Sequence, residues 1–167
     1  MRFRLKALVG RLKRGLASAG SGPETQEPAG RGPTGRPEAD GQVGLPDADF
    51  RTVKIEYEPR MDGDPDPGEV VWAWVPFEED PTQGKDRPII IVGRTGRYLA
   101  GVALTSRDHQ RPDSFALGKG PWDKEGRDSF AKLDRVLTID PVRVRREGAV
   151  LDPGRFRALV EALGSLH

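Results

Sequence analysis

Two groups of carboxylates are the first feature of this sequence that could do chemistry. Residues 78–80 read Glu-Glu-Asp, and aspartates alternate with other residues over 62–66. Carboxylate oxygens are the ligands that hard divalent cations prefer, so either group could hold one. The second group lacks the glycine and the distal glutamate that a calcium-binding loop places at fixed spacing. Solvated loop charge is therefore the favoured interpretation of both groups.

Signature motifs of several enzyme classes are absent. There is no G-x-x-x-x-G-K-[ST] phosphate loop, no H-E-x-x-H and no G-x-S-x-G. The chain has no cysteine, which excludes disulfides and thiolate metal sites and favours the cytoplasm as its location. With only two histidines, His109 and His167, a histidine-rich metal site is also disfavoured. We therefore expect no metal ion and no cofactor.

The net charge of +1 conceals an uneven distribution. Residues 1–20 contain six Lys or Arg and no acid, so the other residues carry a net charge of −5. That balance gives the main part of the chain no overall attraction for nucleic acid, and any such binding must rest on local clusters. No apolar run approaches the roughly 20 residues that span a bilayer. The apolar stretch at 7–9 is too short for a secretory signal.

Residues 1–19 and 20–49 are predicted to lie outside the main domain. Apolar residues recur at helical spacing from Leu5 to Leu16, which predicts a basic amphipathic helix over 1–19. Such a helix could make weak contact with a membrane surface or a partner through residues 1–18. A solvated, partly frayed tail is the favoured alternative, because short isolated helices are marginal in water. Residues 20–49 are rich in Gly and Pro, so we expect a disordered, flexible linker.

Residues 50–167 are predicted to form one mainly β domain that ends in a helix. Pro88 is expected at the first position of its strand, where a missing N–H does least harm. Asp152 and Pro153 predict the start of the C-terminal helix. Several short strands followed by one helix indicate a small closed or half-closed barrel. Strand patterns cover residues 53–57, 69–77, 88–92, 98–106, 115–117 and 130–139, with short extended pieces at 142–144 and 149–151.

Four short motifs follow one another in the β domain. Gly68 to Trp72 (G-E-V-V-W) starts a strand, and Gly84 to Pro88 (G-K-D-R-P) leads into an apolar one. Leu104 to Ser106 (L-T-S) ends a later strand, and Leu133 to Asp140 (L-D-R-V-L-T-I-D) comes before the closing helix. Their order and spacing over 68–165 resemble the PemK/MazF family of bacterial toxins. The resemblance implies a mainly β, SH3-like barrel with a C-terminal helix.

The resemblance also implies an activity. Family members are metal-independent endoribonucleases that cleave single-stranded RNA, act as homodimers, are neutralised by a cognate antitoxin and bind DNA through the antitoxin complex. The implied reaction is attack by the RNA 2′-OH on the adjacent phosphate, which leaves a 2′,3′-cyclic phosphate and a 5′-OH. Arg87 matches the family arginine, whose fork suits bidentate phosphate contact. Thr105 matches the catalytic threonine, and Ser106 lies beside it. The alternatives are a loop-end salt bridge for Arg87 and plain strand propensity for Thr105.

Further side chains could serve an RNA-cleaving site. His109 follows Thr105 closely, and imidazole can donate or accept a proton near neutral pH, although an exposed loop histidine without a role is equally compatible. Trp122 is a candidate base-stacking platform, whereas Trp72 and Trp74 share one strand face and are expected in core or dimer packing. Solvated surface is the alternative for the cations that could contact RNA phosphates, which are Arg107, Arg111, Lys119, Lys124 and Arg127.

Two features favour a different function. The roughly 50 residues before the β domain exceed what a minimal family member needs, and acidic residues between 78 and 86 would repel RNA. The alternative is therefore a non-catalytic SH3-like binding module, tethered by the linker to a membrane- or partner-binding N-terminal helix.

Overall fold

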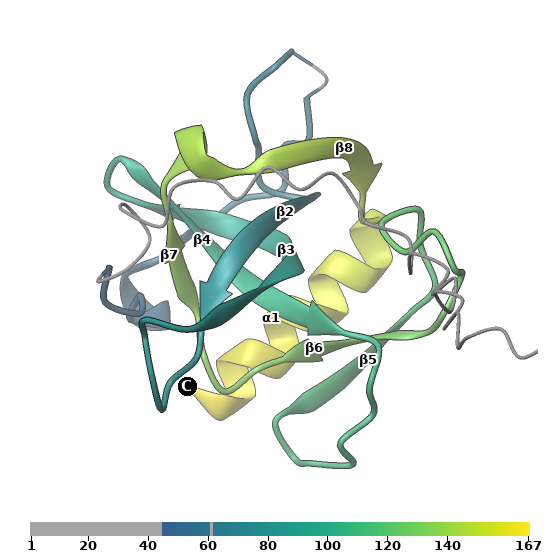
Figure 1. Cartoon of the computed structure of the whole chain (residues 1–167). Coiled ribbons are helices and arrows are strands. Elements are labelled where there is room, and N and C mark those ends of the chain that lie inside the picture. Colours follow the sequence, from purple (N-terminus) through teal and green to yellow (C-terminus); the bar gives the residue numbers. More distant parts are fainter. Residues whose placement is uncertain (1–44, 61) are drawn as a thin grey trace, which may run out of the picture. The chain divides into compact units, whose positions relative to one another are not determined.

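A computed structural model describes residues 45–60 and 62–167 (Figure 1). The helix predicted over 1–19 and residues 20–44 of the predicted linker lie outside the described residues. In chain order the elements are η1 (Phe50–Thr52), β1 (Lys54–Ile55), β2 (Glu69–Pro76), β3 (Gly84–Thr95), β4 (Tyr98–Thr105), β5 (Ser114–Gly118), β6 (Ser129–Lys132), β7 (Leu137–Ile139), η2 (Pro141–Arg143), β8 (Arg145–Val150) and α1 (Pro153–Leu166), where η marks a 3-10 helix.

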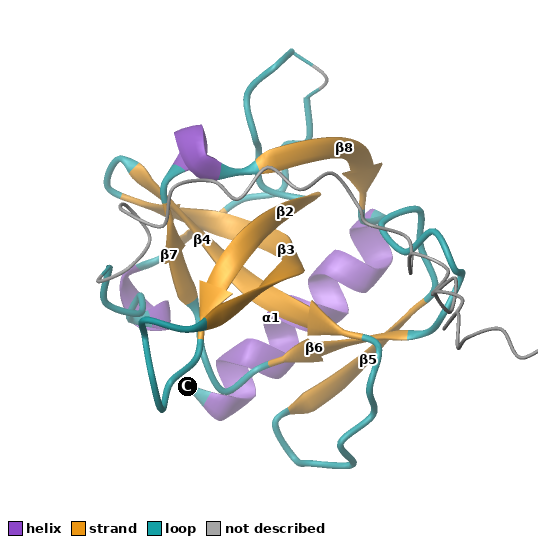
Figure 2. Cartoon of the chain, viewed as in Figure 1, coloured by secondary structure: helices purple, strands orange, loops and turns teal. Residues whose placement is uncertain are grey.

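The strands form one antiparallel arrangement with a single α-helix after it (Figure 2). Neighbouring strands follow the order β5-β6-β4-β3-β2-β8, while β1 adds to β3 and β7 adds to β4. The predicted mainly β class and the C-terminal helix are therefore confirmed. Among the described strands no pairing joins β5 to β8, so the sheet stays open between these two. The designation as an SH3-like barrel remains a prediction.

The run Ile89–Val92 explains why β3 lies at the centre of the sheet. All four side chains are fully buried, and alternate ones enter two different hydrophobic clusters. Ile90 and Val92 join the cluster that includes the buried face of α1, whereas Ile89 and Ile91 pack with residues of β2, β4 and β7. A strand covered on both faces reads as a continuous apolar run, not as an alternating one.

Helix α1 begins as its sequence predicts. The Asp152 side chain accepts a hydrogen bond from the Arg155 N–H at 3.0 Å, and Pro153 takes the first helical position. One face is buried through Phe156, Leu159 and Leu163. These side chains cover one face of the central strands (Figure 1). No described helix is long and apolar enough to cross a membrane.

Three predicted element boundaries differ from the structure. Strand β3 starts four residues before Pro88, which lies inside the strand opposite Trp72, one residue before the pairing with β4 begins at Ile89. The single strand predicted over 130–139 is two strands, β6 and β7, because each pairs with a different part of β4. The extended piece predicted at 142–144 overlaps the 3-10 turn η2, which Asp140 caps by accepting from the Val142 N–H.

Residues 45–49 pack against the β domain, so its contacts extend before the boundary predicted at residue 50. The Ala48 N–H donates to the Val136 carbonyl at 2.8 Å. The Asp47 carboxylate binds the guanidinium of Arg135, in the connection between β6 and β7. This segment therefore lies beside the connection that carries part of the site described next.

Candidate functional site

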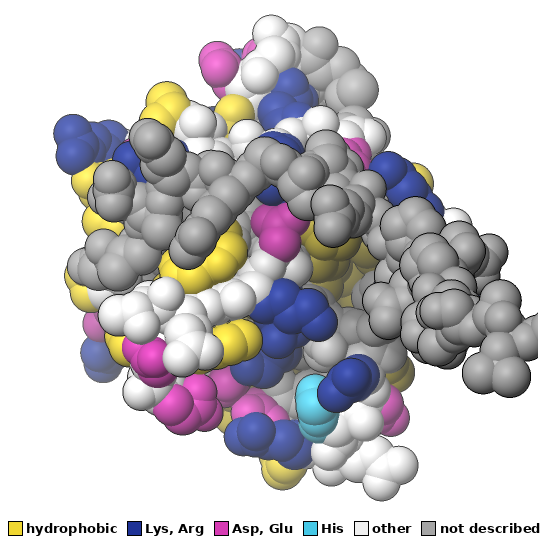
Figure 3. Space-filling model, viewed as in Figure 1, with side chains coloured by type: hydrophobic (Ala, Val, Ile, Leu, Met, Phe, Trp, Pro, Cys, Tyr) yellow, Lys and Arg dark blue, Asp and Glu magenta, His cyan; other side chains and the backbone are white. Residues whose placement is uncertain are grey.

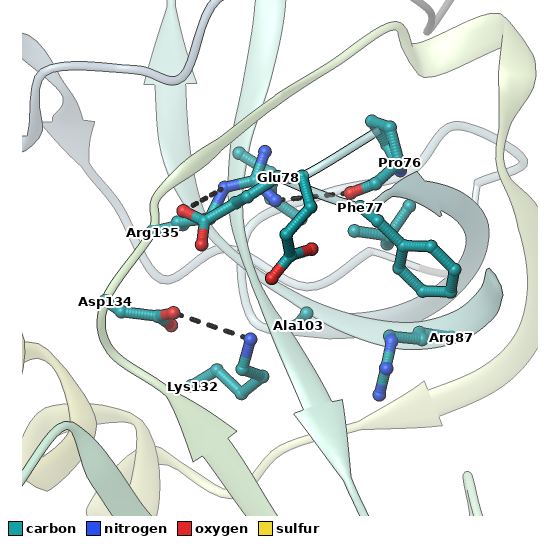
Figure 4. Close-up of a pocket in the computed structure, with 11 residues that line it drawn as sticks. Pro76, Phe77, Glu78, Arg87, Ala103, Lys132, Asp134 and Arg135 are labelled. Carbon is teal, nitrogen blue, oxygen red and sulfur yellow. Dashed lines mark hydrogen bonds and ion pairs between the residues drawn. The ribbon is translucent and has the colours of Figure 1, made fainter. Parts of the chain in front are cut away.

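A cavity opens between the end of β2, the start of β3 and the connection from β6 to β7. Its volume is about 200 Å³, and we call it the Arg87 cavity (Figure 4). Strands β2 and β3 supply one wall, while the connection after β6 supplies the other. Its lining residues are Val75, Pro76, Phe77, Glu78, Glu79, Arg87, Ala103, Lys132, Asp134, Arg135 and Leu137.

Arg87 lies on β3 opposite Ala73 of β2, and its side chain is half-buried. No described residue forms a hydrogen bond or an ion pair with its guanidinium, as Figure 4 illustrates. The loop-end salt bridge considered for it is therefore not made within the described part of the chain. A half-buried cation without a partner is ready to bind an anion, because it has already lost part of its hydration.

Lys132 and Asp134 form the second charged group of the Arg87 cavity. The Lys132 Nζ lies 3.4 Å from the Asp134 Oδ2. The other oxygen, Oδ1, is buried and has no hydrogen-bond partner among the described residues. A buried acceptor without a partner is costly, and such groups occur at sites that a ligand completes. An ammonium and a carboxylate side by side can also give and take a proton.

Arg135 is tied to three surrounding groups. Its Nε and Nη2 donate to the Asp47 carboxylate at 2.8 and 3.0 Å, and its Nη1 donates to the Pro76 carbonyl at 3.2 Å. The Glu78 carboxylate lies 3.5 Å from Nε. Hydrogen bonding to Asp47 is the largest cause that raises the pKa of Arg135. Although Arg135 lines the cavity, its guanidinium already donates hydrogen bonds to the Asp47 carboxylate and the Pro76 carbonyl.

The acidic stretch 78–86 is less repulsive to an anion than its sequence indicates. Asp80 caps its own turn by accepting from the Thr82 N–H and hydroxyl, which lowers its pKa. Asp86 forms an ion pair with Arg145 of β8. Glu78 and Glu79 alone among these acids line the cavity, and Glu78 faces Arg135. Basic and acidic side chains lie near one another on the face shown in Figure 3.

Thr105 ends strand β4 and is nearly buried. The pairing of β3 with β4 ends where Ile89 lies opposite Ala103, and Arg87 and Thr105 each lie two residues from this pair on their own strand. The Thr105 hydroxyl accepts from the Arg107 N–H at 3.2 Å, so its own hydrogen remains available for donation. Thr105 does not itself line the cavity. Ser106 is exposed and follows it in the chain.

The other residues predicted for the site are not among the lining residues of the Arg87 cavity. His109 is on the exposed segment between β4 and β5 and is not a lining residue. Arg107 and Arg111 are exposed on the same segment, where Arg111 pairs with Asp113 at 3.0 Å. Lys119, Lys124 and Arg127 are exposed between β5 and β6. Of the residues predicted for the site, the structure therefore places only Arg87 in the lining of the cavity, with Thr105 at the end of the neighbouring strand β4.

Two aromatic residues differ in exposure from what the sequence indicates. Trp122, predicted as a stacking platform, is 2% exposed and donates its indole N–H to the Ser129 hydroxyl at 2.9 Å. It offers no open face to a base and belongs to the core beside α1. Phe77, for which the sequence predicts no role, is 38% exposed on the rim of the cavity near Arg87 (Figure 4). An exposed ring next to a cation is a suitable surface for a base.

Lys132, Asp134 and Phe77 are the lining residues that sequence reasoning missed. Lys132 and Asp134 occupy alternating polar positions of a strand-like segment, where the ordinary interpretation is a solvated strand face. Their only sequence signal is their place in the last of the four motifs and just before it. Among the described residues no group of three or more His, Asp or Glu side chains is arranged to hold a metal ion.

Comparisons with known proteins bear on this fold and site. Solved structures similar to this chain include crystal structures of MazF and of MazE-MazF from Deinococcus radiodurans, with 22% and 23% identity and TM-scores of 0.48 and 0.46. Each match covers 63% of this chain and 97% or 96% of the matched chain. Curated relatives include the secondary metabolism regulators laeA of Aspergillus flavus and Aspergillus niger, 28% and 27% identical over 141 residues. These matches cover 73% of this chain, which spans only 37% of either relative.

A protein-family match extends over the whole described site. The model of the PemK-like, MazF-like toxin of type II toxin-antitoxin systems matches residues 66–167, which is more than half of the chain. The matched region runs from just before β2 to the end of α1 and contains every lining residue of the Arg87 cavity. The chain therefore belongs to the family of PemK-like and MazF-like toxins of type II toxin–antitoxin systems.

Proposed function

We propose that this chain is an endoribonuclease that cleaves single-stranded RNA in the Arg87 cavity. The observation that carries the proposal is the half-buried guanidinium of Arg87, which has no partner among the described residues and lies in the same cavity as the Lys132–Asp134 pair. In the proposed reaction the 2′-OH of the RNA attacks the adjacent phosphorus, and the bond from phosphorus to the 5′-oxygen breaks. The products are a 2′,3′-cyclic phosphate and a 5′-OH.

Arg87 is the proposed stabiliser of the charged phosphorane. Its guanidinium can donate two parallel hydrogen bonds to phosphate oxygens, and the absence of a partner among the described residues means that no protein contact must first be broken. Thr105, on the neighbouring strand β4, would add a hydrogen bond from its hydroxyl, whose oxygen accepts from the Arg107 N–H. These donors would bind the transition state, where the negative charge is largest, more strongly than the substrate.

Asp134 and Lys132 are the proposed acid–base pair. The carboxylate of Asp134 would accept the 2′-OH proton, and the ammonium of Lys132, 3.4 Å from it, would protonate the departing 5′-oxygen. After the reaction Asp134 has gained one proton and Lys132 has lost one. The 3.4 Å separation of the two groups allows them to exchange that proton and return to the starting state.

Phe77 is the proposed base-stacking residue. Its ring is exposed at the rim of the cavity, so a base next to the scissile phosphate can lie against it. This reaction uses only side chains of the chain itself, so we propose that it needs neither metal ion nor cofactor. Membership of a toxin–antitoxin family supports a cognate antitoxin as partner. A homodimer and DNA binding through the antitoxin complex are extensions of the same family argument.

The proposal is tested by inducing wild type and Arg87→Ala in a bacterial host and mapping new 5′-OH ends in cellular RNA. Purified protein is then incubated with RNA oligonucleotides in excess chelator. We expect growth arrest and cleavage with wild type only, and cleavage undiminished by the chelator. Intact RNA with folded wild-type protein would contradict the proposal, and cleavage that the chelator stops would contradict its metal-independent part.

A non-catalytic binding module is the second candidate function. Glu78 and Glu79 on the cavity wall favour it, because carboxylates next to Arg87 would weaken phosphate binding. Under this alternative, overexpression leaves growth and RNA unchanged, while the protein still binds a partner. The RNA end-mapping experiment separates the two candidates directly.

A further inference from the structure

The closest contact that Arg135 makes is with a residue outside the region that matches the toxin family. Asp47 precedes the matched region by 19 residues, yet its carboxylate takes two hydrogen bonds from the Arg135 guanidinium, at 2.8 and 3.0 Å. Two parallel N–H···O bonds are the geometry in which arginine binds either a carboxylate or a phosphate. The Asp47 carboxylate therefore fills the position on Arg135 that a phosphate would take.

Arg135 is a lining residue of the Arg87 cavity. It lines the cavity together with Arg87 and Lys132, and its side chain is 17% exposed. A cation in this position would add to phosphate binding, but Asp47 and, at 3.5 Å, Glu78 offset its charge. The free protein therefore presents fewer available cations to RNA than the lining residues indicate.

The Asp47 carboxylate is placed so that it can leave. It is 41% exposed, so water can replace the guanidinium as its partner at low cost. The neighbouring backbone contact, from the Ala48 N–H to the Val136 carbonyl, does not involve the side chain of Asp47 and can persist when that side chain turns away. Arg135 also keeps its hydrogen bond to the Pro76 carbonyl, which holds the guanidinium at the cavity wall.

We propose that Asp47 is an internal competitor of the RNA, whose carboxylate occupies on Arg135 a second phosphate subsite next to the one at Arg87. This inference rests on the proposed function, since it assigns RNA as the ligand of the same cavity. When RNA binds, one of its phosphates replaces Asp47 on the guanidinium, and the Asp47 carboxylate turns to solvent. The segment before the matched region thereby lowers the affinity of the toxin for RNA.

The test compares two variants that remove the same charge from the same segment. Asp47→Asn removes the carboxylate that binds Arg135, whereas Asp49→Asn removes one that binds Arg51 instead. Binding is measured by fluorescence anisotropy with a fully 2′-O-methylated single-stranded oligonucleotide, which cannot be cleaved. We expect Asp47→Asn to bind about 2- to 5-fold more tightly than wild type, the range for a partly exposed ion pair, and Asp49→Asn to bind as wild type does.

Two further measurements separate competition from a structural effect. Releasing Arg135 should steepen the slope of log affinity against log salt by about 0.7, the value for one added phosphate contact on a single strand. Arg135→Gln should cancel the gain, so the double variant Asp47→Asn/Arg135→Gln binds no more tightly than Arg135→Gln alone. Thermal unfolding checks that each variant is folded, and Asp47→Ala serves as a second variant if Asp47→Asn is not.

Each outcome decides for or against the inference. Tighter binding of Asp47→Asn that depends on Arg135 supports it, even if wild type cleaves no RNA, in which case the proposed cleavage alone fails. Equal or weaker binding of folded Asp47→Asn overturns it, even if wild type cleaves RNA. If neither wild type nor Asp47→Asn binds the oligonucleotide, the inference and the proposed function both fail.

Discussion

Lys132 and Asp134 lie side by side in the Arg87 cavity, with the Nζ of one 3.4 Å from the Oδ2 of the other. The second Asp134 oxygen is buried and has no hydrogen-bond partner among the described residues. Asp134→Asn keeps the shape of the side chain but cannot accept the 2′-OH proton. We expect it to lower the single-turnover rate of RNA cleavage by about 100- to 10,000-fold, the usual contribution of a general base.

A matched variant shows whether the effect is specific to this carboxylate. Asp128→Asn removes the same charge from an exposed position just before β6, outside the cavity. We expect it to cleave RNA at the wild-type rate. Equal rates for Asp134→Asn and wild type would exclude Asp134 as the proton acceptor.

Arg87 makes no hydrogen bond or ion pair with a described residue, so its variants should affect activity far more than stability. Arg87→Ala should lower the cleavage rate by about 100-fold or more, as expected for loss of a donor that stabilises transition-state charge. Arg87→Lys keeps the charge but loses the planar fork, so it should recover only part of the rate. The free energy of unfolding, measured in urea, should change by no more than about 0.5 kcal/mol.

Lys85→Ala is the control for Arg87, because Lys85 points to the same side of β3 and is exposed outside the cavity. It should weaken RNA binding slightly and uniformly across sequences, without a specific loss of cleavage rate. If Lys85→Ala and Arg87→Ala had equal effects on the rate, the role of Arg87 would be general charge attraction, not stabilisation of the phosphorane.

Phe77 and Trp122 should respond to truncation in opposite ways. Phe77→Ala removes an exposed ring at the cavity rim and should weaken RNA binding by about 1 to 3 kcal/mol, with little change in stability. Trp122→Ala removes a buried ring and should lower the free energy of unfolding by about 3 to 5 kcal/mol. Urea unfolding and fluorescence anisotropy are measured on both variants. If Trp122 were the stacking residue, Trp122→Ala would weaken RNA binding and Phe77→Ala would not.

Local sequence patterns predict much of the fold. The alternation in 69–77 and the capping residues Asp152 and Pro153 each act within a few residues, so their strand and helix are predicted closely. The break between β6 and β7 was not predicted, since nothing in residues 133–136 marks a turn. It arises because β6 pairs with the end of β4 and β7 with its beginning, which is a long-range property.

The site was predicted in part, for a related reason. Arg87 and Thr105 are found because family resemblance marks them. Lys132 and Asp134 reach the cavity only because β4 lies between β3 and β6 and brings those strands together. Trp122 is a case in which the surrounding composition misleads, because a tryptophan between lysines favours a nucleic-acid surface. The pairing of β5 with β6 instead places Ser129 where its hydroxyl accepts a hydrogen bond from the buried Trp122 indole.

Asp66 should give the stability of the protein an unusual pH dependence. Its Oδ1 accepts from the Arg94 Nη2 at 2.6 Å, but its Oδ2 is buried without a partner among the described residues, and burial raises the pKa of this carboxyl. A raised pKa means that the folded protein takes up the proton before the unfolded chain does as the pH falls. The contribution of Asp66 to stability is therefore present at low pH and is lost as the pH rises through its folded-state pKa.

Asp66→Asn removes this titration, so the stability of wild type relative to the variant should increase as the pH falls from 7 to 4. The measurement is urea unfolding of both proteins at several pH values, with the difference in unfolding free energy plotted against pH. Asp64→Asn, on the same loop but exposed, is the control and should give a flat difference. If the unfolding free energy of wild type relative to Asp66→Asn decreased toward pH 4, the Arg94 ion pair would outweigh burial at Asp66. Protonation of a carboxylate that is stabilised mainly by a neighbouring cation removes that ion pair and lowers the stability of the protein.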